Sequence, residues 1–226
     1  MEPRPPQGPA KIELSQEDKE LAVYFEGITI ISISNKILLI LTWRHLKRAT
    51  DFLVKNSSQE AMKEMEERLK KAGLFFKNRG PVRIFDDKLA TYNEFCIAST
   101  QEDLDTLDVA SSIDDKDDPR VYLKLGELYG FPQSAINVFH DIKEFEKRNN
   151  LAPLDLKAQR YQDTIALSLR EKRKLIPAEL RPFCHFIMSR AHWKFELEVS
   201  KKWAEEIKLV APTLYQSVID QSKRKK

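Results

Sequence analysis

The side chains best suited to metal chemistry are Cys184 and the histidines near it. His185 follows Cys184 directly and His192 comes seven residues later, so the two imidazoles share a face if this segment is helical. That spacing separates them by about 10 Å along a helix axis, which is too far for one ion to bridge. A helix predicted over 132–148 could add His140 if it packed nearby. We expect no metal site; if one exists, we expect it to use Cys184, His185, His192 and His140.

Nucleophilic catalysis by a cysteine needs a base beside the thiol. Cys96 lies between Phe95 and Ile97, which is typical of a core position, and neighbouring Glu94 offers no positive charge to a thiolate. No H-E-x-x-H or G-x-S-x-G pattern occurs, and none of the 6 glycines forms a phosphate-binding loop. Nothing in the sequence argues for an enzyme, the question of catalysis stays open, and no cofactor is expected. A Cys/His metalloprotein or enzyme is the third hypothesis.

The clearest local pattern in the sequence predicts a tight turn between two helices, 119–129 and 132–148. Gly130 suits the left-handed residue that ends a helix, and Pro132 suits the first turn of the next one. Helix-turn-helix proteins use a corner of this kind, with a small residue such as Gly126 where the two helices approach each other. We therefore take the corner as a candidate binding site, made of Tyr129, Gly130, Phe131, Pro132, Gln133, Ser134 and Asn137.

In a DNA-binding protein, Gln133, Ser134 and Asn137 would face the bases at the start of the recognition helix. The same helix continues with acidic residues that phosphates would repel, namely Asp141, Glu144 and Glu146. Any tight hairpin of two helices also produces this spacing. A structural corner is thus the favoured interpretation, and DNA binding is the alternative.

The elements that would position these residues predict an α+β fold, mostly helical, with a small antiparallel sheet around 74–98. Before the sheet we expect a helix over 15–25, a short strand over 28–33, a helix over 37–54, and a helix that starts after Ser57 or Ser58 and ends at Lys71 and Gly73. The three expected strand runs are 74–77, 82–85 and 94–98. Beyond Thr100 we expect only helices, over about 100–109, 119–129, 132–148, 155–173 and 182–211.

Two further segments bear on the organisation of the chain. The acidic stretch 102–118 has no glycine and lacks the terminal glutamate of an EF-hand loop, so we expect a solvated connection. The last predicted helix is apolar on more than one side, with Trp203 off the main stripe, which predicts burial within the domain. We expect a disordered leader over 1–12, a single compact domain over 13–221 with an α+β half to about 100 and a helical half after it, and a basic tail over 222–226.

Several of these features occur in an order that is similar to a known family. A β run over 95–99 and a short helix precede Leu-Gly-x-x-Tyr-Gly-Phe-Pro at 125–132, and Arg181-Pro-Phe-Cys184 precedes a long helix ending in Ala-Pro-Thr-Leu-Tyr215. Over about 75–219 the chain resembles an uncharacterised archaeal and bacterial domain-of-unknown-function family. Its members carry a Leu-Gly-Tyr-Pro-x-Cys-Cys turn and a later Pro-Cys-x-x-x-Cys segment.

In that family the four cysteines look like a metal or redox cluster. The resemblance assigns the four positions to Ser134, Ala135, Cys184 and Met188 in this chain. Only one of them is a cysteine here. The resemblance therefore implies a scaffold that has lost its family's cluster.

Composition narrows the class of protein. The chain has 226 residues, 42% of them hydrophobic, which is enough for a packed core. The 38 Lys and Arg nearly balance the 35 Asp and Glu, which does not favour nucleic acid. Two cysteines cannot make a disulfide framework and indicate a reducing compartment. The most apolar stretch, 28–41, is shorter than the ~20 residues of a spanning helix. We expect a soluble cytoplasmic protein with no membrane contact.

The function favoured by these observations is a non-catalytic binding or interaction module. Its partner is unknown from sequence. A protein is one candidate partner, and nucleic acid is another that is not favoured.

Overall fold

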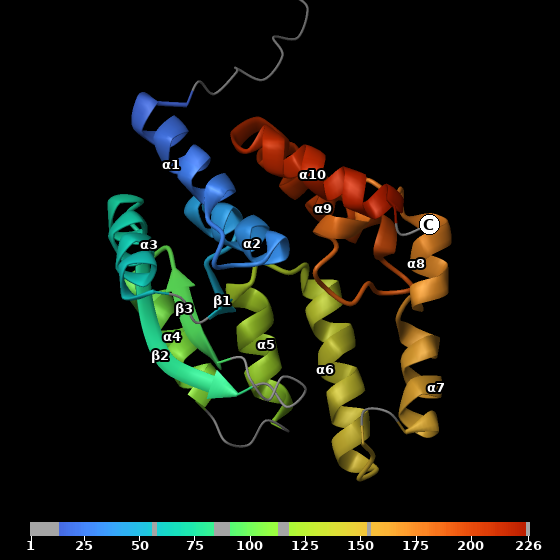
Figure 1. Ribbon diagram of the computed structural model, residues 1–226. Helices are drawn as coiled ribbons and strands as arrows, with labels where there is room; N and C mark the ends of the chain where they lie inside the picture. Colours follow the sequence, from blue (N-terminus) through green and yellow to red (C-terminus); the bar gives the residue numbers. More distant parts are fainter. Residues whose placement is uncertain (1–13, 56–57, 84–90, 113–117, 153–154, 225–226) are drawn as a thin grey trace, which may run out of the picture.

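The computed structural model describes residues 14–55, 58–83, 91–112, 118–152 and 155–224, and it confirms a mostly helical α+β fold with a small antiparallel sheet (Figure 1). In chain order the described elements are α1 (Gln16–Gly27), α2 (Ile33–Trp43), β1 (Ala49–Lys55), α3 (Gln59–Lys71), β2 (Phe75–Arg83), β3 (Thr91–Ala98), α4 (Gln101–Ser112), α5 (Pro119–Leu128), α6 (Gln133–Arg148), α7 (Leu156–Ile165), α8 (Leu169–Leu175), the 3-10 turn η1 (Arg181–Phe183), α9 (Trp193–Val210) and α10 (Pro212–Arg224).

The sheet has the order β1-β3-β2, and both of its neighbouring pairs are antiparallel. Side chains alternate between its two faces. Phe52, Val54, Phe95 and Ile97 belong to the large core that also contains residues of α2 and α3. On the other face, Ala49, Cys96 and Ala98 pack with leucines of α4 and α5. Both faces of the sheet are therefore covered by helices.

Helix α2 lies at the centre of the molecule, between the sheet and the pair α9 and α10 (Figure 1). Leu39, Ile40 and Leu41 on this helix are completely buried. One continuous core connects α1, α2, α3, the sheet, α9 and α10. Because a helix that is apolar all round needs neighbours on every side, the position of α2 follows from its sequence.

Several expected helices are confirmed, and side-chain caps explain where they begin. The Ser15 hydroxyl accepts the backbone N–H of Asp18 at the start of α1, and Ser58 does the same for Ala61 at the start of α3. Gly73 follows α3 with a φ of +70°. Helices α5 and α6 lie within a residue or so of the expected 119–129 and 132–148.

The expected strand over 28–33 is wrong. The chain there forms a short connection with Ile28 and Ile31 buried, and the Ser32 hydroxyl caps α2 by accepting the Asn35 N–H. The expected helix over 37–54 is also wrong beyond Trp43, because the chain reverses at His45, where φ is +56°, and continues as β1. The alternating isoleucines of 28–33 therefore reflect burial in the core and not pairing in a strand.

The sheet lies where it was expected, but its third strand is different. The runs 74–77 and 82–85 were expected as two strands. Instead, β2 continues through Gly80 and Pro81 to Arg83 with an irregular register between Asn78 and Pro81. The third strand is β1, which pairs with β3. Residues 84–85 lie outside the described part of the chain.

The last two expected helices are each interrupted. The predicted helix over 155–173 breaks between α7 and α8, where Ala166 forms a bridge with Ser189. The predicted helix over 182–211 is helical only in η1 and α9, and residues 184–192 between them are irregular. Backbone hydrogen bonds from Leu167 to Met188 and from Arg190 to Ile165 hold this segment against the break.

The acidic stretch was expected as a solvated connection, which is wrong for its first part. Residues 102–112 belong to α4, and this helix covers the sheet. Buried Asp103 pairs with Arg48, while Asp108 accepts hydrogen bonds from Lys77 and Arg79 of β2. Residues 113–117 lie outside the described part. Two acids of α4, Asp103 and Asp108, are therefore paired with bases that lie just before β1 and on β2.

The structure covers only part of the two terminal segments that were expected, the leader over 1–12 and the basic tail over 222–226. Residues 1–13 lie outside the described part, and of the expected basic tail the structure describes 222–224, which belong to α10. Among the described residues, no helix combines the length and apolar character needed to cross a membrane.

Candidate functional site

The corner between α5 and α6 is built by two glycines. Gly130 has a φ of +65°, and a Cβ there would lie 2.8 Å from the backbone oxygen of Leu46. A Cβ on Gly126 would lie 2.7 Å from Cγ1 of Ile136, so α5 and α6 approach each other closely. Pro132 precedes α6 as its capping residue. The corner is thus fixed by contacts that only glycine permits.

A cavity of about 290 Å³, which we call the corner pocket, lies between α5, α6 and residues 185–187. Its wall is mostly apolar and rich in rings. The ring-bearing residues that line it are Tyr122, Tyr129, Phe131, Phe139, Phe186 and His185. Small residues, Gly126 and Ala135, leave the space that these rings surround. Two of the residues expected at the corner, Tyr129 and Phe131, therefore belong to a preformed pocket.

His185 is the main polar residue of this wall. Burial, helped by the positive charge of Lys47, lowers the pKa of its imidazole to about 4, so the ring is neutral at pH 7. Its Nε2 is buried and has no hydrogen-bond partner among the residues that the structure describes. Buried polar atoms are normally paired, so this nitrogen is an exception; because it has essentially no exposed surface, it does not face the open space of the pocket.

Lys47 lies behind the wall of the corner pocket. It is 2% exposed, and its Nζ lies 4.5 Å from the ring centroid of Trp203 and 4.6 Å from that of Phe131. The amine also donates a hydrogen bond to the Tyr129 carbonyl at 2.5 Å. Burial lowers the pKa of this amine to about 7, and the charge of Asp51 opposes the shift. The ring faces and the carbonyl stabilise its charged form.

Tyr129 joins the pocket to the sheet. Its hydroxyl donates to Asp51 Oδ1 of β1 at 2.6 Å. Burial, with the neighbouring Asp51 carboxylate, raises the pKa of this hydroxyl well above its usual value. The ring of Tyr129 is therefore held in one orientation by its hydroxyl and by the Lys47 contact to its own carbonyl.

Glu196 fixes the remaining side of the site. This residue of α9 is fully buried, and its carboxylate accepts hydrogen bonds from Ser134 Oγ at 2.6 Å and from the Ser189 N–H at 2.8 Å. Burial raises the pKa of the carboxyl group. The contacts connect the start of α6 to the irregular segment 184–192. Glu196 therefore helps to hold in place the segment that contributes residues 185–187 to the corner pocket.

The structure separates the other residues expected at the corner. Gln133 and Asn137 lie on the exposed face of α6, where the Gln133 amide donates to Asn137 Oδ1 at 2.8 Å. Ser134 points instead to Glu196. The helix face beyond Asn137 carries exposed Asp141 and half-buried Glu144. These positions form a polar face with acidic residues, distinct from the pocket.

The residues considered for metal binding are not assembled. His192 lies at the start of α9, and His140 is beside Asp141 and Glu144 on α6. The Cys184 thiol contacts the Leu180 carbonyl at 3.4 Å, and burial raises its pKa. Within the described ranges, no three His, Cys, Asp or Glu side chains come together as metal ligands would. The shared helix face assumed for His185 and His192 does not form, because 184–192 is irregular.

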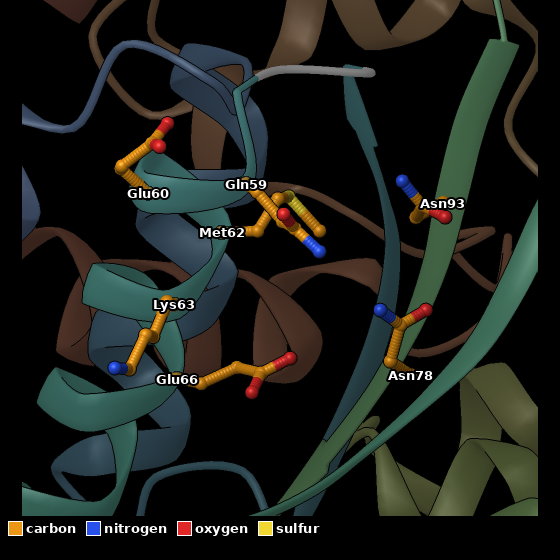
Figure 2. Close-up of a pocket in the computed structure, with 7 residues that line it drawn as sticks. All are labelled: Gln59, Glu60, Met62, Lys63, Glu66, Asn78 and Asn93. Atoms are coloured by element: carbon orange, nitrogen blue, oxygen red, sulfur yellow. The ribbon is translucent and has the colours of Figure 1, made fainter.

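A second, larger groove lies between α3 and the sheet (Figure 2). It measures about 770 Å³ and is open to solvent. In Figure 2, Gln59, Met62 and Glu66 of α3 extend toward Asn78 and Asn93 on the strands. The Asn78 side-chain oxygen already accepts a hydrogen bond from the Gly80 N–H. The groove has mixed polarity and does not select one ligand chemistry.

Sequence reasoning missed the residues behind the corner pocket. Lys47 falls in a basic run that carries no motif, and it becomes special only because the chain reverses at His45. Glu196 looked like an ordinary helix acid. For Trp203 the sequence did give an indication, since this residue lies off the main apolar stripe of its helix, and it is 2% exposed in the structure.

The chain matches no protein-family model, no curated protein and no solved structure.

Proposed function

We propose that this protein is a non-catalytic binding module and that the corner pocket is its ligand site. The observation that carries this proposal is a preformed cavity of about 290 Å³ with a mostly apolar, aromatic wall that also includes His185. Binding sites for small molecules are typically concave, mostly apolar and furnished with a few polar groups.

The size of the corner pocket limits the ligand. Pockets for drug-sized molecules start at about 300 Å³, and an apolar cavity of about 150 Å³ holds benzene. A cavity of about 290 Å³ suits one aromatic ring or two fused rings. Phe131, Phe139 and Phe186 supply ring faces and edges against which such a ligand can stack.

The thiols argue against covalent catalysis by cysteine. A thiolate is the reactive form of cysteine. Burial raises the pKa of Cys96 to about 12 and also raises that of Cys184, so both are thiols at neutral pH. Both are free of disulfides, in keeping with the cytoplasmic location that we also propose.

The family resemblance fits the same location. It assigns the four cysteine positions to Ser134, Ala135, Cys184 and Met188. Ala135 lines the corner pocket, Ser134 is bonded to Glu196, and Cys184 immediately precedes His185 in the wall. We propose that the place of a lost cysteine cluster has become an apolar ligand site on a retained scaffold.

The test uses three ring compounds, indole, quinoline and naphthalene, added to ¹⁵N-labelled protein. We expect at least one of them to shift the NMR signals of α5, α6 and 185–187 in a saturable way.

Two variants test where the compounds bind. In Ala135→Leu a larger side chain fills the pocket, so binding should be lost. Ala158→Leu makes the same change at a buried alanine of α7 that does not line the pocket, and it should bind as the parent does. Circular dichroism checks that both variants are folded. The proposal is wrong if no compound binds, or if folded Ala135→Leu binds unchanged.

A further inference from the structure

Helix α8 is strongly basic. Its sequence, Leu-Arg-Glu-Lys-Arg-Lys-Leu, holds four bases and one acid. The acid, Glu171, forms an ion pair with Arg190, which lies outside the helix. The helix and this partner together have five bases and one acid, a net charge of +4, whereas the whole chain carries only +3. The nearly balanced composition of the chain therefore includes a local excess of positive charge, which is typical of a surface that contacts anionic partners.

Three of these cations and one leucine share the outer face of α8. Residues one, three and four apart lie on the same side of a helix, and the exposed residues of α8 with this spacing are Leu169, Arg170, Arg173 and Lys174. Among the residues that the structure describes, none of the three cations has an ion-pair partner. Leu169 is 78% exposed, more than any other large apolar side chain in the described ranges. The outer face thus combines unpaired positive charge with an exposed apolar group.

The inner side of α8 is fixed to the domain. The Lys172 amine donates a hydrogen bond to the Phe186 carbonyl at 3.2 Å. The Glu171 carboxylate forms a capping box with Ser168 and accepts hydrogen bonds from Arg190. Because these contacts hold the inner side, the outer face is presented on a rigid element.

A membrane surface with anionic lipids uses both properties of the outer face. Its headgroups attract Lys and Arg side chains, and an exposed leucine gains free energy when it enters the boundary between headgroups and acyl chains. A nucleic acid would pair its phosphates with the cations but would offer no apolar contact to Leu169. Cytoplasmic leaflets are rich in anionic lipids, which agrees with the location proposed above.

We propose that the outer face of α8 binds the surface of membranes that contain anionic lipids. Leu169 inserts between the headgroups, while the three cations contact lipid phosphates and carboxylates. Such peripheral binding needs no spanning segment, so it is compatible with the short apolar stretch 28–41 from which we expected no membrane contact. It is also independent of the corner pocket.

The experiment measures how the full chain co-sediments with vesicles of phosphatidylcholine and phosphatidylserine in a ratio of about 2:1. Binding should be at least about tenfold stronger than to pure phosphatidylcholine vesicles. It should weaken as salt is raised from about 0.1 M to about 1 M, because salt screens the attraction.

Two variants test the outer face. In the triple variant Arg170→Gln, Arg173→Gln, Lys174→Gln, the partition coefficient should fall about fivefold for each charge removed and about a hundredfold in all. In Leu169→Ala it should fall by at least about threefold, since less apolar surface can insert. Circular dichroism checks that both variants are folded.

Each variant has a matched control. Lys19→Gln, Lys63→Gln and Lys70→Gln together remove the same net charge from exposed lysines of α1 and α3, which lie away from α8 in Figure 1. Leu156→Ala removes a leucine that is 71% exposed at the same first position of α7. Both controls should bind the vesicles as the parent does.

Three outcomes would overturn the proposal. The first is equal binding of the parent to both kinds of vesicle. The second is a triple variant that binds as the parent does or loses no more than its lysine control, since the effect would then follow net charge and not the outer face of α8. The third is binding of the parent to a DNA duplex without binding to the phosphatidylserine vesicles, which would assign the face to nucleic acid.

Discussion

Ser134 at the start of α6 donates a hydrogen bond to Glu196 of α9 at 2.6 Å, although 62 residues separate them in the chain. The same carboxylate accepts the Ser189 N–H. Glu196 is completely buried, so each of these bonds stabilises a group that has lost its water. The pair ties the α5–α6 corner to the segment that forms the opposite wall of the pocket.

The bond between Ser134 and Glu196 predicts a measurable loss. Ser134→Ala should lower the free energy of unfolding by about 1–3 kcal/mol, because a buried carboxylate loses one of its partners. Urea unfolding at pH 7 measures it. Ser217→Ala is the control, since that exposed hydroxyl donates to the Thr213 carbonyl on its own helix, and it should change stability by less than about 0.5 kcal/mol. A loss below about 1 kcal/mol in Ser134→Ala would contradict a buried role for the hydroxyl.

The corner predicts a graded response to alanine. Gly130→Ala should destabilise by about 1–3 kcal/mol or more, because φ is +65° and the new Cβ would meet the Leu46 carbonyl. Gly126→Ala should also destabilise, since the clash with Ile136 outweighs the helix propensity gained. Gly27→Ala is the matched control, with no atom within 4 Å of the new Cβ, and it should be neutral or stabilising. Thermal unfolding ranks the three, and equal effects would mean that the corner is not tightly packed.

His185 predicts an acid-sensitive fold. Its pKa is about 4 in the folded protein and 6.5 when exposed, so between these values the unfolded chain binds the proton and the folded one does not. The contribution to stability therefore falls as the pH is lowered from 6.5 to 4, by about 3 kcal/mol in all. Chemical denaturation at several pH values should show this slope reduced in His185→Phe and kept in His192→Ala, where the exposed histidine is removed. Identical slopes in the parent and His185→Phe would refute the prediction.

Lys47 predicts the corresponding effect on the alkaline side. Burial lowers the pKa of its amine from 10.5 to about 7, so the unfolded chain binds more protons between these values. Stability attributable to Lys47 should rise as the pH rises from 7 to 10.5, by about 5 kcal/mol at most. The difference in unfolding free energy between the parent and Lys47→Met should change over this range. Lys194→Met, at an exposed lysine of α9, should give a constant difference. A constant difference for Lys47→Met would count against the lowered pKa.

Metal content gives a final check on the site. Untagged protein should contain no stoichiometric zinc or iron by elemental analysis, because the Cys184 thiol has a raised pKa and contacts a carbonyl instead of other metal ligands. Cys184→Ala should give the same result. A stoichiometric metal that disappears in this variant would show that Cys184 is a ligand after all.

Features that depend on near neighbours in the chain could be read from the sequence. The α+β class, the caps at Ser15 and Ser58, and the Gly130–Pro132 corner all follow from interactions within a few residues. The sheet region was located too, because aromatic and β-branched runs signal strands whatever their partners are. Tyr129 and Phe131 could be placed at a candidate site for the same local reason.

Only the tertiary structure decided what these elements pair with. Residues 49–54 were expected to be helical but belong to β1, because β3 lies beside them. Residues 184–192 leave the expected helix because Glu196 and the α7–α8 break hold their backbone. In the sequence, Lys47 and Glu196 look like ordinary polar residues, and His185 was considered only as part of a metal site. Their burial and altered pKa values arise from contacts with segments more than 50 residues away in the chain, and sequence patterning carries no information about burial produced over such distances.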